Sequence, residues 1–259
     1  MKINIYQIDA FAKNTFEGNP AAVCPLKEWL SDETMQKIAA ENNLSETAFF
    51  IKENNTFHIR WFTPVNEVDM CGHATLASAY VIFECLNYKK KEIIFDSKSG
   101  ILKVSKENGR YKMDFPAQKI EKYKVLDVIL KAFDLKPIEC YKSMDYILVF
   151  KNEKDILNIK PDFELLKLLD KRGVIITAKS KKYDFVTRFF APKLGINEDP
   201  VTGSAFTQLI PYWSKILNKN ILNAKQLSQR GGEVFCCLKN DRVEISGYAA
   251  KYMEGSIYI

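Results

Sequence analysis

Histidine is scarce in this chain. Only His58 and His73 occur among 259 residues, and neither a CxxC nor an HExxH motif is present. These scarcities argue against a histidine-rich metal site, so we expect no metal. The six cysteines are scattered, in a chain too long to need a disulfide framework. We therefore expect reduced thiols and a cytoplasmic location.

Long apolar runs are also lacking. No stretch approaches the ~18 residues of a membrane helix, and the N-terminal MKINIYQIDAF alternates like a strand and does not resemble a signal peptide. We expect no membrane contact. The net charge of +6 is spread over short lysine-rich runs such as 89–91 and 179–182. Because no aromatic-interleaved basic stretch accompanies them, nucleic-acid binding is not expected, although a modest positive field could attract a small anionic substrate.

The chain contains the same order of elements twice. With 47% apolar and 27% charged residues it is an ordinary globular sequence, long enough for one large domain or two modest ones. Strand patterns, a nearly all-apolar helix and further strand patterns appear once and then again. We predict an N-terminal half over 1–116 with a central helix at 73–86. A C-terminal half over 117–259 follows, with a central helix at 203–217, and its last strand could pack on the first half.

Two stretches echo each other in matching places: RWFTPVNEVDMCGHAT, from Arg60, and RFFAPKLGINEDPVTGSA, from Arg188. Each runs Arg, two aromatics, a small residue, Pro, acidic residues, Gly and an apolar helix. The second carries three more residues before its glycine. A short Arg-aromatic-Pro match can arise by chance, but the similarity continues through the glycine and the helix. This extent favours an internal duplication.

Both copies place a glycine where a helix is predicted to start, at Gly72 and at Gly203. The first turn of a helix has unpaired N–H groups and partial positive charge, and glycine allows a ligand to approach the backbone. Two such helix starts facing each other would suit a carboxylate. The alternative is that Thr202 or Asp199 merely caps a buried helix.

Candidate proton carriers lie near these helix starts. Glu46, in NLSETAFF, sits between a polar turn and an apolar strand, so we expect partial burial. Burial raises the pKa of a carboxyl group toward neutrality, which suits a group that takes and returns a proton. His73 and Asp199 flank the two glycines. Each also has a structural interpretation: a surface glutamate, a packed histidine, or an aspartate in a turn or cap.

At these residues the sequence resembles the phenazine-biosynthesis PhzF-like family, within the diaminopimelate-epimerase-like fold. Residues from about 119 to 182 match only loosely, and the remainder of the chain carries the motifs. The matching stretches are QIDAFAKNTFEGNPAAV, NLSETAFF, EVDMCGHATLASAY, Ser99-Gly100, EDPVTGSA and SQRGGEV.

The resemblance implies an α+β fold of two pseudo-symmetric halves, each a barrel-like mixed sheet around a central helix, with the active site between them. It also implies proton transfer on a small anionic carboxylate substrate without a metal or nucleotide cofactor, and a homodimer.

By motif, the resemblance assigns roles to individual residues. Glu46 falls on the family's acid/base, while His73 and Asp199 fall on polar positions that contact substrate. The remaining assignments are substrate-binding: Ser204 as a further polar contact, Gly72 and Gly203 as the helix starts that hold the carboxylate, and Asn19 in a loop near the site.

One position separates this chain from amino-acid epimerases of the wider fold, which use a thiol before each glycine. Cys71 precedes Gly72, but Thr202 precedes Gly203, and a threonine hydroxyl is too weak an acid to replace a thiolate. The leading hypothesis is therefore a cofactor-independent isomerase. An epimerase or racemase that pairs Cys71 with a non-thiol base such as Glu46 is the second hypothesis, and a non-catalytic carboxylate-binding protein is the third. The sequence does not name the substrate.

Overall fold

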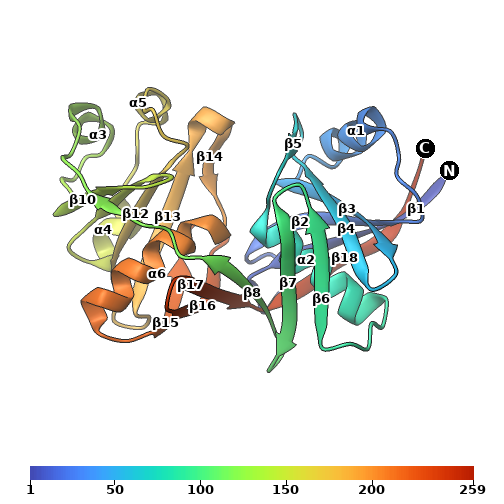
Figure 1. The fold of residues 1–259 in the computed structure, drawn as a ribbon. Coiled ribbons are helices and arrows are strands. Elements are labelled where there is room, and N and C mark those ends of the chain that lie inside the picture. Colours follow the sequence, from blue (N-terminus) through green and yellow to red (C-terminus); the bar gives the residue numbers. More distant parts are fainter. The chain divides into compact units, whose positions relative to one another are not determined.

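Two units, each with its own core, make up the chain. The computed structural model describes all residues 1–259 and divides into unit 1, Met1–Asp114 with Ser246–Ile259, and unit 2, Phe115–Ile245. The ribbon in Figure 1 shows the elements of each unit. The C-terminal strand belongs to unit 1, so unit 2 is inserted in the sequence of unit 1.

Unit 1 is built from a mixed sheet, one peripheral helix and one buried helix. Its strands are β1 (Lys2–Ala10), β2 (Asn19–Leu26), β3 (Glu46–Glu53), β4 (Thr56–Phe62), β5 (Glu67–Val68), β6 (Glu92–Ser97), β7 (Gly100–Glu107), β8 (Arg110–Pro116) and β18 (Ala249–Tyr258). Its helices are α1 (Asp32–Asn42), α2 (Gly72–Tyr80) and the π-helical η1 (Val81–Cys85).

Unit 2 has a corresponding sheet and a longer buried helix. Its strands are β9 (Glu121–Lys122), β10 (Glu139–Lys142), β11 (Tyr146–Val149), β12 (Val174–Lys179), β13 (Phe185–Ala191), β14 (Ile196–Asp199), β15 (Ile221–Gln226), β16 (Gly232–Lys239) and β17 (Arg242–Gly247). Its helices are α3 (Asp127–Ala132), α4 (Glu153–Asn158), α5 (Phe163–Lys167), η2 (Pro192–Leu194) and α6 (Gly203–Leu217).

The strand pairings repeat from unit to unit. In unit 1, β1 pairs antiparallel with β2, β2 parallel with β3, β3 antiparallel with β4, β4 parallel with β6, and β6 antiparallel with β7. The same alternation links β10, β11, β12, β13, β15 and β16 in unit 2. The short strands β5 and β14 each pair antiparallel with the strand of the echoed motif, β4 or β13. This agreement confirms the predicted α+β fold of two pseudo-symmetric halves.

The central helix of each unit is buried because its residues are small or apolar on every side. In α2 every residue from His73 to Ala79 is buried, and in α6 almost the whole run from Ala205 to Ser214 is buried. The helix predicted at 73–86 begins at Gly72, and from Val81 to Cys85 it continues as a π-helix. Helix α6 covers the predicted 203–217.

The echoed arginines make the same contact in both units. Arg60 donates from Nε and Nη2 to Glu67 at 2.7 and 2.8 Å, and Arg188 donates to Glu198 at 2.7 and 2.9 Å. A planar guanidinium suits such a bidentate pair. The extra residues of the second copy form η2, which ends at Gly195 with a φ of 82°, a conformation that glycine adopts without strain. The insertion therefore adds a turn and preserves the ion pair.

The Arg60–Glu67 pair predicts an acid-sensitive component of stability. Hydrogen bonds from Arg60, helped by Lys98 and opposed by burial, lower the pKa of Glu67 from 4.5 to about 2. A lowered pKa stabilises the folded state fully above pH 4.5, and this stabilisation is lost as the pH falls toward 2.

We expect Glu67→Gln to lower the free energy of unfolding at pH 7 by about 1–3 kcal/mol. The variant should also lose less stability than the parent between pH 5 and pH 2. Urea unfolding at several pH values checks both expectations. Asp32→Asn is the control, since Asp32 is the exposed second partner of Arg60. An identical acid profile for Glu67→Gln and the parent would contradict this assignment.

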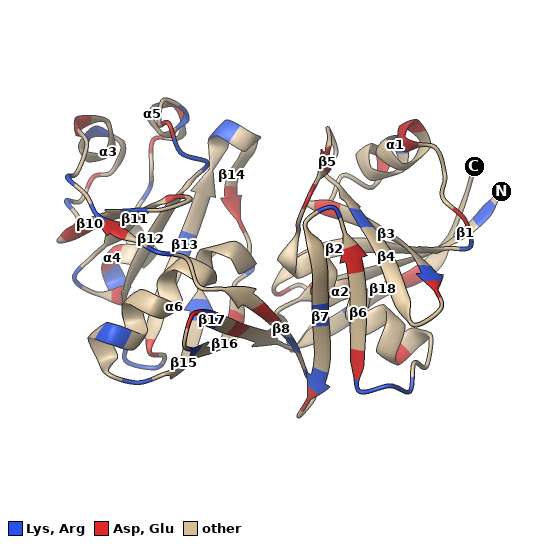
Figure 2. Ribbon diagram, viewed as in Figure 1, with Lys and Arg blue, Asp and Glu red and all other residues tan.

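Charge is distributed without segregation. Figure 2 shows basic and acidic residues interspersed along the elements of each unit. None of the helices combines the length and the apolar character needed to cross a membrane.

Candidate active site

Glu46 and His73 are direct neighbours in unit 1. Glu46 is the first residue of β3, where that strand begins its parallel pairing with β2, and its side chain is 12% exposed. His73 is the second residue of α2, and Glu46 Oε2 lies 3.0 Å from its Nε2. The apolar run after Glu46 enters the sheet and buries this end of the strand. Two of the three predicted proton carriers thus form one buried acid–imidazole pair.

The other ring nitrogen of His73 contacts two further side chains. Asn19 Nδ2 lies 3.2 Å from His73 Nδ1, and Cys71 Sγ lies 3.5 Å from the same atom. Asn19 begins β2 and is fully buried, while Cys71 is the N-cap residue of α2. When Asn19 donates to Nδ1, the ring proton resides on Nε2, which faces Glu46. Asn19 therefore holds the ring with Nε2 toward the carboxylate.

Opposing effects act on the titration of this cluster. Burial lowers the pKa of His73, but Cys71 and Glu46 together outweigh it, and the pKa of His73 lies well above 6.5. Burial raises the pKa of Cys71 to about 11, with a further contribution from Glu46. At neutral pH Cys71 is therefore a thiol, which is a poor base.

The same cluster has the donor types of a metal site. One ligand atom from each of Glu46, Cys71 and His73 lies within 4.8 Å of the others. Carboxylate, thiolate and imidazole are all zinc ligands, but the thiol would have to lose its proton first. Our expectation of no metal stays a prediction.

Asp199 lies in a network of buried side chains in unit 2. It is the last residue of β14 and is 9% exposed. The hydroxyl of Thr202 donates to Asp199 Oδ2, and Gln226 Nε2 donates to the Asp199 carbonyl at 2.7 Å. Gln226 also accepts from Thr202 N at 3.0 Å. Thr202 is the N-cap of α6 without a side-chain capping bond, because its hydroxyl contacts Asp199 instead.

Ser204 has a partner that the sequence did not suggest. Arg172 Nη2 donates to Ser204 Oγ at 2.9 Å and to Asp145 Oδ2 at 2.6 Å. Asp145 is fully buried and also accepts from Gln208 Nε2 at 2.7 Å. Ser204 and Gln208 lie one turn apart on α6, so this network ties the first turn of α6 to the start of β11.

The two glycines begin helices, as the sequence predicts. Gly72 is the first residue of α2 and Gly203 the first residue of α6, and neither N-cap residue makes a side-chain capping bond. Within unit 1 the start of α2 lies beside the Glu46–His73 pair, and within unit 2 the start of α6 lies beside Asp199 and Ser204. That Gly72 and Gly203 hold one carboxylate together stays a prediction.

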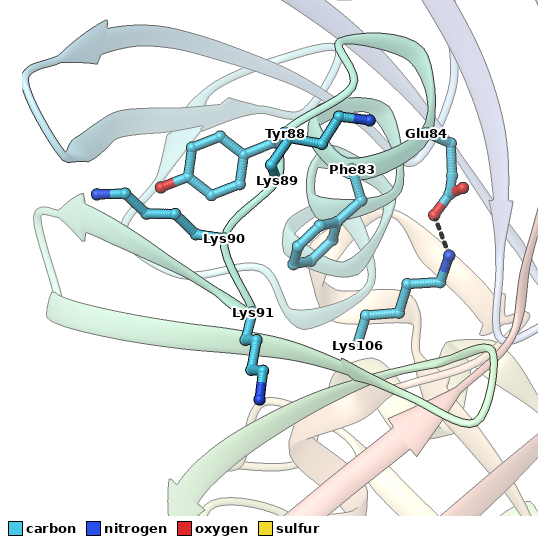
Figure 3. Close-up of a pocket in the computed structure, with 7 residues that line it drawn as sticks. All are labelled: Phe83, Glu84, Tyr88, Lys89, Lys90, Lys91 and Lys106. Atoms are coloured by element: carbon cyan, nitrogen blue, oxygen red, sulfur yellow. Dashed lines mark hydrogen bonds and ion pairs between the residues drawn. The ribbon is translucent and has the colours of Figure 1, made fainter.

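A cavity of about 290 Å³ lies elsewhere in unit 1, at the C-terminal end of the buried helix (Figure 3). It is lined by Phe83, Glu84, Tyr88, Lys89, Lys90, Lys91 and Lys106. Lys106 is paired with Glu84 at 2.6 Å, and the amino groups of Lys89, Lys90 and Lys91 point away from one another in Figure 3. None of the predicted site residues lines this cavity, and its charged side chains do not gather around one point.

Sequence reasoning missed Arg172, Asp145, Gln208 and Gln226. Arg172 and Asp145 lie in the loosely patterned middle of the chain, where no motif marks them. A polar residue within the otherwise apolar helix α6, Gln208, was the one available signal. A buried amide needs hydrogen-bond partners, and Asp145 supplies one.

Comparison with known proteins shows similarity to one protein family. The family model described as phenazine biosynthesis-like protein, PhzC-PhzF, matches residues 8–255. An uncharacterized isomerase of Pseudomonas aeruginosa is 48% identical over 259 residues, covering 100% of both chains. A crystal structure of a PhzF-family phenazine biosynthesis protein from Enterococcus faecalis has a TM-score of 0.98 at 47% identity and covers 100% of both chains.

A structure with lower sequence identity shares the same fold. A predicted epimerase from Pseudomonas aeruginosa superposes with a TM-score of 0.75 at 18% identity, over 99% of each chain. At this identity the similarity concerns the fold alone, and it is the epimerase-like fold that the repeated strand pairings display.

Proposed function

Since the chain belongs to the phenazine biosynthesis-like PhzC-PhzF family, we propose that it is a cofactor-independent isomerase that moves a proton within a small carboxylate substrate. An isomerase function in general is supported by relatives that carry that name. The observation that carries the finer proposal is the 3.0 Å contact between Glu46 Oε2 and His73 Nε2 in a buried setting.

The proposed reaction begins at the carboxylate of Glu46. It removes a proton from a carbon of the substrate and returns it to another atom of the same molecule. His73 stabilises the carboxylate before the transfer and holds a proton on Nε2 toward it. Asn19 keeps the ring in this orientation.

Residues of unit 2 complete the proposal as substrate-binding groups. Asp199, held by Thr202 and Gln226, would bind or relay a proton to a polar group of the substrate. Ser204 and the N–H groups at Gly72 and Gly203 would bind the substrate carboxylate. A homodimer and a cytoplasmic location belong to the same proposal, and light scattering of the purified protein tests the dimer.

Solvent exchange provides the test of the reaction class. Candidate carboxylates are incubated with the protein in D₂O, and ¹H NMR records which C–H signals disappear. The panel contains amino acids and unsaturated acids. Deuterium gain at a new carbon of an isomerised product supports the proposal. Absence of C–H exchange in the whole panel, together with binding of the same compounds, would favour the non-catalytic carboxylate-binding protein.

The contact between Cys71 and His73 supports one alternative, an epimerase in which the thiol works opposite Glu46. Cys71 Sγ lies 3.5 Å from Nδ1, but a pKa of about 11 leaves few thiolates at neutral pH.

We expect Cys71→Ser to retain the rate of C–H exchange within about fivefold, because a packing residue next to a hydrogen bond contributes on the order of 1 kcal/mol. Exchange rates in D₂O measure this. Loss of exchange by a factor of a hundred or so, with inversion at an amino-acid Cα in the parent protein, would establish the epimerase instead.

A further inference from the structure

Arg172 occupies a defined place against the sheet of unit 2. It precedes β12 by two residues, and its guanidinium lies over the Phe189 ring, 5.4 Å from the centroid. The next residue is Gly173, where a Cβ would come within 2.7 Å of Phe189 Cζ. Glycine therefore lets the backbone approach that ring. Phe189 is also the strand partner of Asp199, so Arg172 lies beside the predicted substrate-binding residues of this unit.

A buried carboxylate fixes the orientation of the guanidinium. Asp145 accepts from Arg172 Nε at 3.0 Å and from Nη2 at 2.6 Å, and it is fully buried. Gln208 completes the arrangement, because it donates to Asp145 Oδ2 at 2.7 Å and accepts from Asp145 N at 3.1 Å. The Nε–Nη2 edge of the guanidinium is thus occupied by the structural ion pair with Asp145.

The other edge faces Ser204. Arginine has donors and no acceptor, so Ser204 Oγ accepts the 2.9 Å bond from Arg172 Nη2. The Ser204 hydroxyl hydrogen must then point elsewhere, and within unit 2 no side chain or carbonyl accepts it. Arg172 Nη1 also has no partner within the unit, and the Arg172 side chain is 32% exposed.

We infer that Arg172 and Ser204 form the carboxylate-binding pair of unit 2, in which Arg172 positions the Ser204 hydroxyl as a donor to the bound carboxylate. A carboxylate accepts hydrogen bonds and donates none, so it matches the Ser204 hydroxyl, whose hydrogen is directed away from the guanidinium. This inference rests on the proposed function, because it identifies how Ser204 recognises the substrate. Arg172 is a positioning residue, and it acts through Ser204.

Acetate is a probe that requires no knowledge of the substrate. ¹⁵N-labelled protein is titrated with sodium acetate, and with acetamide as the neutral isostere, while the amide signals of Gly203, Ser204 and Ala205 are followed by NMR. We expect saturable shifts with acetate and none with acetamide. Arg172→Lys retains the charge beside Asp145 but loses the planar fork, and we expect it to bind acetate about tenfold more weakly. We expect a similar loss for Ser204→Ala.

The double variant separates positioning from a structural role. If Arg172 acts through Ser204, Arg172→Lys in the Ser204→Ala background should cost no more than about threefold further. Independent effects would multiply to about a hundredfold and would overturn the inference. Lys171→Met is the matched control, since it removes a charge one residue away, and its affinity for acetate should stay within about twofold.

Two further outcomes would also overturn the inference. One is parental acetate affinity in Arg172→Lys, and the other is absence of acetate binding to the parent protein. Failure of the proposed isomerase is distinguishable, because it would appear as absence of C–H exchange in D₂O while acetate still binds. Unfolding midpoints of all variants identify any change that arises from lost structure.

Discussion

Glu46→Gln is expected to lower the rate of C–H exchange in D₂O by about 10²–10⁴, the usual contribution of a positioned acid or base. The amide has nearly the same shape as the carboxylate and can occupy the same place beside His73 Nε2. It cannot accept and return a proton. The folded structure should therefore persist while the reaction stops. Unchanged exchange in this variant would rule out Glu46 as the proton carrier.

A matched control lies at the other end of the same strand. Glu53 closes β3 and lies 3.2 Å from His58 Nε2, in an exposed acid–imidazole pair. Glu53→Gln makes the same chemical change in a contact of the same type away from the helix start. We expect its exchange rate to equal that of the parent. A comparable loss in both variants would indicate an indirect effect on the sheet.

The scarcity of histidine provides a second readout that needs no substrate. With two histidines, a pH titration followed by NMR yields two sets of ring signals to assign. Burial lowers the pKa of His73, whereas Cys71 and Glu46 raise it. Glu46→Gln removes one of the two contributions that oppose burial, so the pKa of His73 should fall. A His73 signal that titrates identically in both proteins would contradict the ion pair.

Arg188→Met is expected to lower the free energy of unfolding by about 3–5 kcal/mol, the cost of breaking a largely buried ion pair. Arg188 donates to Glu198, and its Nη1 also donates to the carbonyls of Ile156 and Ile159 at 3.0 and 2.8 Å. Those carbonyls lie at the C-terminal end of α4, where the helix provides no partner. The substitution removes the hydrogen bonds of a carboxylate and of two buried carbonyls together.

The echoed position in unit 1 is the natural control. Arg60 makes the same bidentate contact with Glu67, but its third partner is the exposed Asp32, which water can solvate when the arginine is removed. We expect Arg60→Met to cost about 1–3 kcal/mol, clearly less than Arg188→Met. Urea unfolding at pH 7 measures both. Equal costs would show that the carbonyl contacts of Arg188 contribute nothing.

Much of the fold was predictable from local sequence patterns, because the duplicated halves carry the same strand and helix patterns in the same order. The glycine before each apolar helix correctly located the starts of α2 and α6. The echo around Arg60 and Arg188 correctly marked equivalent strands. The change from α-helix to π-helix at Val81 was not predictable. A helix that is apolar on every side has no amphipathic period from which the number of residues per turn could be inferred.

The candidate site was likewise predictable only in part. Glu46, His73 and Asn19 lie in motifs that reveal their chemical type, but the contacts that join them depend on β2, β3 and α2 meeting in space. Arg172 has no such motif: in the short charged run of residues 170–172, nothing distinguishes it from a surface arginine. Its importance depends on Asp145 and Ser204, which lie 27 and 32 residues away in sequence.

The pairing of β18 with β1 has a consequence for biosynthesis. β1 pairs with β2 on one edge and with β18 on the other, and β18 comes from the opposite end of the sequence. A chain that leaves the ribosome from its N-terminus exposes that second edge of β1 until the last strand is released. Unit 2 is one continuous segment, so it can finish folding before unit 1 is closed. The nascent protein must therefore keep an open strand edge away from other chains for nearly the whole time of its translation.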